Sequence, residues 1–317
     1  MVGKRLRLLP ALLLLLVLPA LAQQSQSKEF SQTVEFEAGG HLRMKTFKGS
    51  IHIRPWDRNE VEIKARIEPG EDVSGDYAAR SVEATKVDVW GSGRSVTITS
   101  DYEDVPCRDD GWSFGCSKTL PYVHYQIRVP QKVDLSVDDH KSSIDVAGLA
   151  GRLEFDTHKG TVELADLAGE VQMKTHKGEV DLDGAEGRIE LQTHKGRIDA
   201  SDVTGDVRVQ THRGRVTVSG LQGSVKAETH RGEISIRADE IDNDSRLETY
   251  RGRIELSLPG SQGLELRARI GRRGDFENDF AITTRTTARD RIEGTINGGG
   301  PRLYLETERG EIHLKRR

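Results

Sequence analysis

Thr157-His158-Lys159-Gly160 is a four-residue motif that the chain repeats at a fixed interval. Further copies begin 18 residues apart, at Thr175, Thr193, Thr211 and Thr229, and the last two carry Arg213 and Arg231 in place of lysine. Related sequences are His140-Lys141-Ser142, Thr249-Tyr250-Arg251-Gly252, Thr46-Phe47-Lys48-Gly49 and Thr307-Glu308-Arg309-Gly310. A fixed period of this length indicates a repeat architecture in which each unit stacks on the next.

Apolar residues flank each motif at every second position. Leu153 and Phe155 precede the first copy, and Val162 and Leu164 follow it. The equivalent positions are apolar in every repeat between residues 135 and 236, and this alternation predicts two short strands per repeat. Glycine marks the second bend of the repeat, where a Cβ would crowd the chain, at Gly169, Gly187, Gly205 and Gly223.

A column of charges supports stacking of these repeats in register. Asp134, Arg152, Glu170, Arg188 and Asp206 occupy one position of successive repeats, and their charges alternate in sign. Opposite charges on neighbouring strands stabilise a sheet, whereas like charges do not. The sequence therefore predicts an all-β fold, a parallel β-solenoid (β-helix) of two-strand coils of about 18 residues with a right-handed turn.

The repeats divide the chain into segments with different expected roles. We expect a signal peptide at 1–22 and a single β-solenoid domain at 23–317. Within that domain the expected parts are an N-terminal rung at 28–67, an insertion at 68–128, regular repeats at 129–258, and C-terminal rungs with a second insertion at 259–317. Alternating stretches at 95–99 and 122–130 predict a hairpin-like first insertion, and residues 303–314 a last rung.

The first 22 residues have the three parts of a secretory signal peptide. Lys4, Arg5 and Arg7 precede the apolar run Leu8–Leu18, and Ala20-Leu21-Ala22 supplies the small residues of a cleavage site. An uncleaved membrane anchor is the alternative, but the run is short for a span. We therefore expect a periplasmic or secreted protein of the bacterial cell envelope, without a transmembrane segment after cleavage.

The charge of the mature chain argues against nucleic acid as a partner. Three of the 47 basic residues lie in the signal peptide, so 44 basic and 51 acidic residues remain, a net charge of −7. An acidic chain lacks the basic excess that phosphate backbones require. We expect an envelope polymer or a protein as the partner.

Cys107 and Cys116 are the two cysteines, and in an oxidising compartment cysteines that bracket a short loop form a disulfide. A metal or redox pair is the alternative, which neither a CxxC spacing nor a neighbouring histidine supports. The same loop contains Gly111-Trp112-Ser113-Phe114-Gly115, a formal match to the nucleophile elbow. That motif requires a strand-turn-helix context, so we expect a glycine-rich disulfide loop; its acids and aromatics, Asp109, Asp110, Trp112 and Phe114, are weaker candidates for binding.

On these features the chain resembles the bacterial putative-adhesin family of β-strand-repeat domains of unknown function. The matching sequences are the stretch Ile53–Asp57, the strand Tyr125–Pro130, the glycine-x-aliphatic-x-aliphatic coils, and the closing stretches Gly298–Pro301 and Thr307–Leu314. The resemblance implies a β-solenoid, a surface or envelope location and no catalytic residues. The turn histidine is a departure, because such repeats more often have a small polar residue there.

Histidine and a basic residue recur together at the turn and are the candidate binding residues: His140, His158, His176, His194, His212 and His230, with Lys159, Lys177, Lys195, Arg213 and Arg231. One interpretation is turn chemistry alone, with threonine ending the strand and glycine allowing a positive φ. A second is a metal ion shared between rungs, for which the candidates are His158, His176, His194 and His212. The neighbouring cations oppose a metal, and no metal or cofactor is expected.

The third interpretation is that this edge recognises an anion, more strongly below about pH 6, where the imidazoles become charged. We therefore predict a non-enzymatic, adhesin-like binding or structural module of the envelope. A metal- or pH-responsive envelope module is the alternative. A polysaccharide-acting β-helix enzyme is the weaker one, because the carboxylates recur in columns and form no unique constellation.

Overall fold

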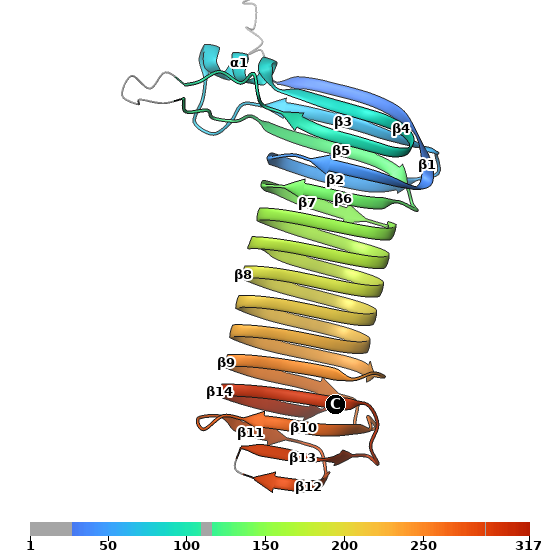
Figure 1. The fold of residues 1–317 in the computed structure, drawn as a ribbon, viewed down its shortest axis with the longest axis vertical. Helices are drawn as coiled ribbons and strands as arrows, with labels where there is room; N and C mark the ends of the chain where they lie inside the picture. The colour runs from blue at the N-terminus through green and yellow to red at the C-terminus, as the bar shows by residue number, and fades with distance from the viewer. Residues whose placement is uncertain (1–26, 109–115, 289) are drawn as a thin grey trace, which may run out of the picture.

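The computed structural model of the protein describes residues 27–108, 116–288 and 290–317. These residues form an elongated stack of strands wound about one axis (Figure 1). The elements in chain order are β1 (Lys28–Lys45), β2 (Lys48–Trp56), β3 (Glu60–Glu68), α1 (Gly75–Ala84), β4 (Lys86–Asp101), β5 (Tyr122–Pro130), β6 (Asp134–Asp139), β7 (Lys141–Ala147), β8 (Ala150–Ile241), β9 (Ser245–Leu258), β10 (Leu264–Ile270), β11 (Asp275–Asn278), β12 (Ile282–Ala288), β13 (Arg291–Ile296) and β14 (Arg302–Arg316). The predicted all-β class is confirmed. The predicted signal peptide and the Gly111–Gly115 motif, with Asp109 and Asp110, lie outside the described residues.

The regular repeats pair in parallel with the next rung. Leu135 lies beside Leu153, and Ile144 beside Val162, so residues 18 positions apart are neighbours. The apolar columns predicted from the sequence point inward, and their members are buried, from Leu135 and Val137 at one end to Ile234 and Ile236 at the other. Instead of separate short strands, β8 is one continuous segment of 92 residues. Its backbone winds through the successive coils that Figure 1 shows in green to orange.

The turn glycine of every regular repeat is required by the neighbouring rung, and only at some turns also by its own φ, which is 155° at Gly160 and 151° at Gly196. At Gly178 and Gly214 the backbone lies outside the left-handed region, so the predicted need for a positive φ does not hold at these turns. A Cβ on Gly214 would lie 1.7 Å from the carbonyl oxygen of Gly196 in the rung before. At the second bend both the positive φ and the neighbouring rung require glycine. Gly187 has a φ of 126°, and a Cβ there would lie 2.1 Å from the carbonyl oxygen of Gly169.

At the N-terminal end, β1 and β2 stack directly on the regular repeats. Leu42 pairs with Leu135 and Ile51 with Ile144. The predicted hairpin in the insertion is wrong: β4 pairs with β1, whereas β5 pairs with β2 and with β3. Alternation of apolar residues identifies a strand but not the strand with which it pairs. Here β4 and β5 pair with the strands of the first rung and not with each other. The expected disulfide is confirmed, with 5.1 Å between the Cα atoms of Cys107 and Cys116.

Helix α1 in the same insertion was not predicted. It buries Ala78, Ser81 and Val82 above the N-terminal strands, and its N-cap residue Ser74 makes no side-chain capping bond. With so small an apolar face and no cap, little in the sequence marks it as a helix. None of the described helices is long and apolar enough to cross a membrane.

The C-terminal strand β14 lies inside the stack and not at its end. It pairs on one side with β9, where Leu305 meets Leu247, and on the other with β10, where Leu305 meets Ala268. The prediction that residues 303–314 form the last rung is therefore wrong. The end is closed by antiparallel pairing of β13 with β10 and with β12. The sheet is consequently mixed, and the hand of the coil stays a prediction.

Candidate functional site

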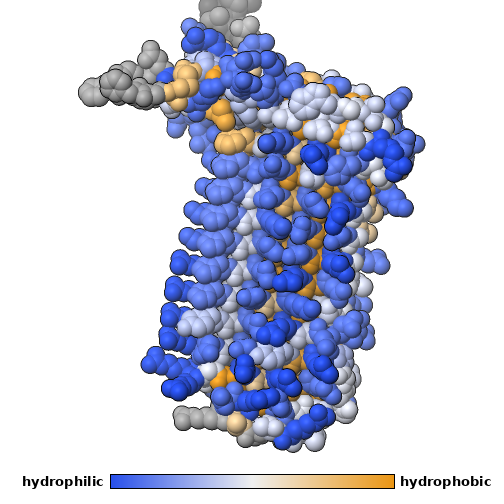
Figure 2. Space-filling model, in the orientation of Figure 1, coloured by the Kyte–Doolittle hydropathy of each residue, from blue (hydrophilic) through white to orange (hydrophobic). Residues whose placement is uncertain are grey.

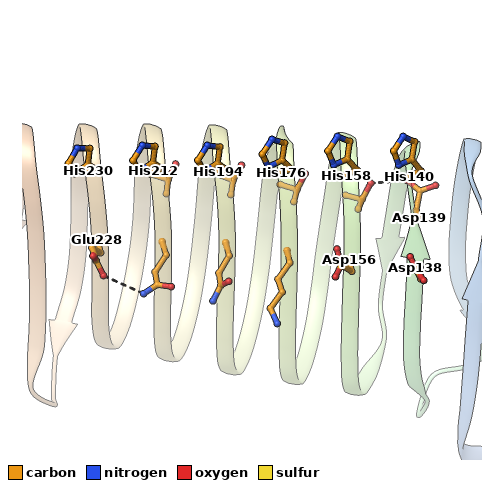
Figure 3. Close-up of a pocket in the computed structure, with 17 residues that line it drawn as sticks. Asp138, Asp139, His140, Asp156, His158, His176, His194, His212, Glu228 and His230 are labelled. Atoms are coloured by element: carbon orange, nitrogen blue, oxygen red, sulfur yellow. Dashed lines mark hydrogen bonds between the residues drawn. The ribbon is translucent and has the colours of Figure 1, made fainter.

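The six histidines of the repeats form one ladder along the stack (Figure 3). Each ring centroid lies 4.9 Å from the next, and neighbouring rings are within 5° of parallel. The residue before each histidine is buried, Asp139 in the first rung and threonine in the others, which places the histidine side chain outside the coil. Since every rung repeats this geometry, the imidazoles face one another, as the sequence predicted.

Two further rings extend the histidine ladder. Phe47 stacks on His140 with centroids 4.5 Å apart, and Tyr250 stacks on His230 at 5.0 Å. Tyr102 in turn contacts Phe47 edge-on, with centroids 6.3 Å apart. Sequence reasoning counted six histidines and missed the two end rings. The signal was present, because the outlying copies of the motif place an aromatic residue at the histidine position.

A row of cations runs beside the histidine ladder, and we call it the basic edge. Its members are exposed: Lys159, Lys177, Lys195, Arg213 and Arg231. The ion pairs within 4.0 Å that the described residues form include none of these five. In the next two rungs towards the N-terminus, Lys141 and Lys48 both lie within 4.0 Å of Glu71, so the part of the row without ion pairs begins at Lys159. Figure 2 shows hydrophilic side chains layered along the stack.

The environment of two rings in the histidine ladder, His176 and His212, favours the neutral imidazole. Loss of hydration lowers the pKa of His176 below 6.5, and the neighbouring imidazoles and lysines lower it further. The pKa of His212 is lowered by the same causes, with arginines in place of lysines. Each ring has like charges as its neighbours once they protonate, so protonation of one ring opposes protonation of the next.

A groove of about 790 Å³ follows the other side of the histidine ladder, and we call it the threonine groove. The histidines form one wall (Figure 3), and Thr157, Thr175, Thr193 and Thr211 also line the groove. The outer wall consists of one outward residue per rung, namely Asp138, Asp156, Lys174, Gln192, Gln210 and Glu228. At the first rung Asp139 replaces threonine, and its carboxylate accepts hydrogen bonds from Ser142 and from the hydroxyl of Thr157. Burial raises the pKa of Asp139.

The ladder geometry does not suit a shared metal ion. Zinc binds imidazole nitrogen at about 2.1 Å, so two ligand nitrogens lie at most about 4.2 Å apart. Parallel rings with centroids 4.9 Å apart do not converge on such a point. In the described part of the chain, no group of three or more His, Cys, Asp or Glu side chains is arranged to hold a metal. The acidic column that includes Glu163 and Asp181 lines a separate groove.

A serine–histidine–carboxylate chain that sequence reasoning missed lies at the N-terminal end. Ser50 Oγ is 2.9 Å from Nδ1 of His124, and Nε2 of His124 is 3.6 Å from the Glu68 carboxylate. Ser50 lies within β2, which is paired on both sides, with β5 and with β7. Its surroundings thus offer no spare pair of backbone N–H donors for an oxyanion. No motif could have revealed the set, because its members are far apart in the sequence.

The fold and the site define a class of all-β repeat proteins with a solenoid-like sheet. The chain belongs to the Toastrack DUF4097 family, whose model matches residues 49–315. The family resemblance inferred from the sequence is thereby confirmed. Among solved structures, the chain is similar to a putative cell adhesion protein from Clostridium sporogenes ATCC 15579, with 13% identity, a TM-score of 0.23, and coverage of 92% of this chain and 100% of that one. No curated protein matches the sequence.

Proposed function

We propose that the protein is a non-enzymatic binding module of the cell envelope, periplasmic or secreted, whose basic edge engages a linear polyanion. In this proposal the rungs are right-handed coils of 18 residues. The observation that carries it is the basic edge itself, five successive cations that no carboxylate of the described residues neutralises. The disulfide between Cys107 and Cys116 supports an oxidising compartment.

The spacing of the basic edge supports a polymer as the ligand. Adjacent rungs lie 4.9 Å apart at the ladder, which is shorter than the screening length of about 8 Å at physiological salt. The five cations therefore repel one another in the free protein and concentrate counterions along a line. A linear polyanion neutralises all five at once and releases those counterions, which favours binding and makes it sensitive to salt.

Charge reversal tests this proposal. We expect Lys177→Glu, Lys195→Glu and Arg213→Glu together to weaken binding of polyphosphate or of a polyuronate by about 100-fold or more, since each cation near an anionic partner contributes about 1 kcal/mol. Affinity is measured by isothermal titration at two salt concentrations. The control has the same net charge, with reversals on the flat faces at Arg208, Lys226 and Arg237. Equal losses in both variants, or none in the first, would refute the role of the basic edge.

The absence of catalysis is also a proposal, and a serine-directed reagent tests it. We expect a fluorophosphonate to leave the intact protein unlabelled, because the serine–histidine–carboxylate chain at Ser50 lacks an oxyanion site. Labelling is followed by mass spectrometry, with Ser50→Ala and Ser113→Ala as the two control variants. Adduct formation that disappears in either variant would identify a nucleophile and contradict the proposal.

A pH-responsive envelope module is a second candidate function, favoured by the stacked histidines. The lowered pKa values of His176 and His212 mean that these two rings become charged only in more acidic solution. The two candidates are compatible, because charging the histidine ladder adds cations beside the basic edge. The two candidate functions predict different results at neutral pH. The polyanion-binding module must bind a polyanion there, whereas the pH-responsive module need not.

A further inference from the structure

Turn residues of the C-terminal strands continue the line of the basic edge. Arg231 pairs in register with Arg251, and Arg251 pairs with Arg309, so both arginines occupy the motif position that follows the histidine ladder. Arg309 reaches this line because β14 lies between β9 and β10 in the stack (Figure 1). The return of the chain into the stack therefore extends the row of cations without a gap.

One further rung adds two more arginines to this line. Ile270 pairs with Thr307, so the turn that follows Ile270 stacks on the turn that follows Thr307. A Cβ on Gly271 would lie 2.2 Å from the carbonyl oxygen of Glu308, which shows that the two turns are in direct contact. The exposed arginines of these C-terminal turns, which we call the arginine extension, are Arg251, Arg309, Arg272 and Arg273.

The arginine extension is as free of ion pairs as the basic edge. Its guanidinium groups form none within 4.0 Å in the described part of the chain, although Glu308 and Asp275 are close in the sequence. The five cations of the basic edge and the four of the extension make nine, distributed over eight successive turns. At about 4.8 Å per rung, this row is about 34 Å long.

The N-terminal end of the row shows how it holds an anion. One carboxylate oxygen of Glu71 lies 3.8 Å from Nζ of Lys48 and 3.5 Å from Nζ of Lys141, and these two lysines belong to successive rungs. A single anionic group thus bridges two neighbouring cations. Glu71 comes from the insertion and occupies the place that a further anion of a bound polymer would take. The row is therefore closed at this end and continues without ion pairs from Lys159.

We infer that the arginine extension belongs to the polyanion site, which takes a polymer of oxyanion groups at least about 34 Å long and is closed at one end by Glu71. This inference rests on the proposed function and adds to it four binding residues and a length requirement. Arginine suits this ligand class, because its planar group donates paired hydrogen bonds to the oxygens of one anion. A short anion can be held by the basic edge alone.

Neutralising the outer turns tests the arginine extension. Arg309→Gln, Arg272→Gln and Arg273→Gln together should weaken binding of long-chain polyphosphate by about 100-fold, since each cation contributes about 5-fold. The slope of log affinity against log salt concentration should fall by about one per cation removed. Tripolyphosphate, which covers only a few rungs, should bind to this variant as it does to the unmodified protein. Isothermal titration measures all these affinities.

The control for this variant removes the same charge from the same end of the stack. It replaces three exposed arginines outside the row by glutamine, and should leave both affinities unchanged, at Arg285, Arg302 and Arg316. The inference is overturned if the variant of the outer turns binds long-chain polyphosphate as tightly as the unmodified protein does, or if the control loses as much affinity.

Removing the carboxylate that closes the row should have the opposite effect. Glu71→Gln frees Lys141 and should tighten binding of long-chain polyphosphate by about 5-fold. Glu103→Gln removes an exposed acid of the same insertion and should not tighten it. Unchanged affinity in Glu71→Gln would contradict the closed end. Failure of the proposed function is a different result, in which reversal of Lys177, Lys195 and Arg213 leaves the binding of long-chain polyphosphate unchanged.

Discussion

Replacing Gly214 by alanine is expected to cost about 3 kcal/mol or more in the free energy of unfolding. The added Cβ would lie 1.7 Å from the carbonyl oxygen of Gly196 and 2.9 Å from its carbonyl carbon. Both are backbone atoms, so no side chain can rotate away to relieve the overlap. Gly232 stacks on Gly214 from the other side, and its own Cβ would meet the Gly214 oxygen at 1.7 Å.

The same substitution at Gly93 separates this steric effect from backbone strain. Gly93 has a φ of 66°, and a Cβ there would meet no heavy atom within 4 Å. Gly93→Ala should therefore cost about 1–2 kcal/mol, the penalty for an L-residue in the left-handed region. Urea denaturation followed by circular dichroism compares the two variants. A Gly214→Ala protein no less stable than Gly93→Ala would show that the rungs can separate at the turn.

The regular repeats could be predicted in detail because their physics is local and repeated. The interval between Thr157 and Thr175 fixes which residues become neighbours, and the alternation of Leu153 and Phe155 fixes which side chains point inward. The charge column was informative in part: Arg152 pairs with Glu170 across one rung and also with Glu154 in its own. Each rung contributes the same evidence again, so an error in one repeat would have been corrected by the others.

The ends of the stack could not be predicted in the same way. Leu305 lies between Leu247 and Ala268, so the chain leaves the stack after β9 and later returns to fill the adjacent place. Apolar alternation in β14 is equally compatible with a terminal rung, because inward burial is the same in both positions. The order of strands depends on which edges are free once the neighbouring segments have folded, and no local pattern encodes that.

The candidate site, like the fold, could be predicted from the sequence only in part. The histidine ladder and the basic edge follow from the repeat and were predicted, whereas the threonine groove was not. From the sequence alone, Thr193 is expected to end a strand with its side chain pointing inward and its hydroxyl capping the turn. The missing partner of its hydroxyl is visible only when all atoms around it are placed.

Acidification is expected to destabilise the free protein through the histidine ladder. Loss of hydration and like-charged neighbours lower the pKa of His176 and of His212 below the ordinary value of 6.5. The unfolded chain therefore binds more protons than the folded one as the pH falls below 6.5, and stability decreases with it. The contribution is fully present above 6.5 and is lost as the pH falls through the lowered values. His176 and His212 are shifted in the same direction, so their contributions to this loss add.

Thermal melts at about pH 7.5 and 5, at constant ionic strength, measure this loss. His176→Gln with His212→Gln should reduce the difference between the two melting temperatures, because these rings contribute to it directly and also repel their charged neighbours. Saturating polygalacturonate should reduce the difference in the unmodified protein, since a polyanion binds the charged folded state more tightly and stabilises it by mass action. Reversal of Lys177, Lys195 and Arg213 should abolish that rescue while the histidine ladder remains intact. An unmodified protein that melts at the same temperature at both pH values would contradict the prediction, because it would show that these histidines bind protons equally in the folded and the unfolded chain.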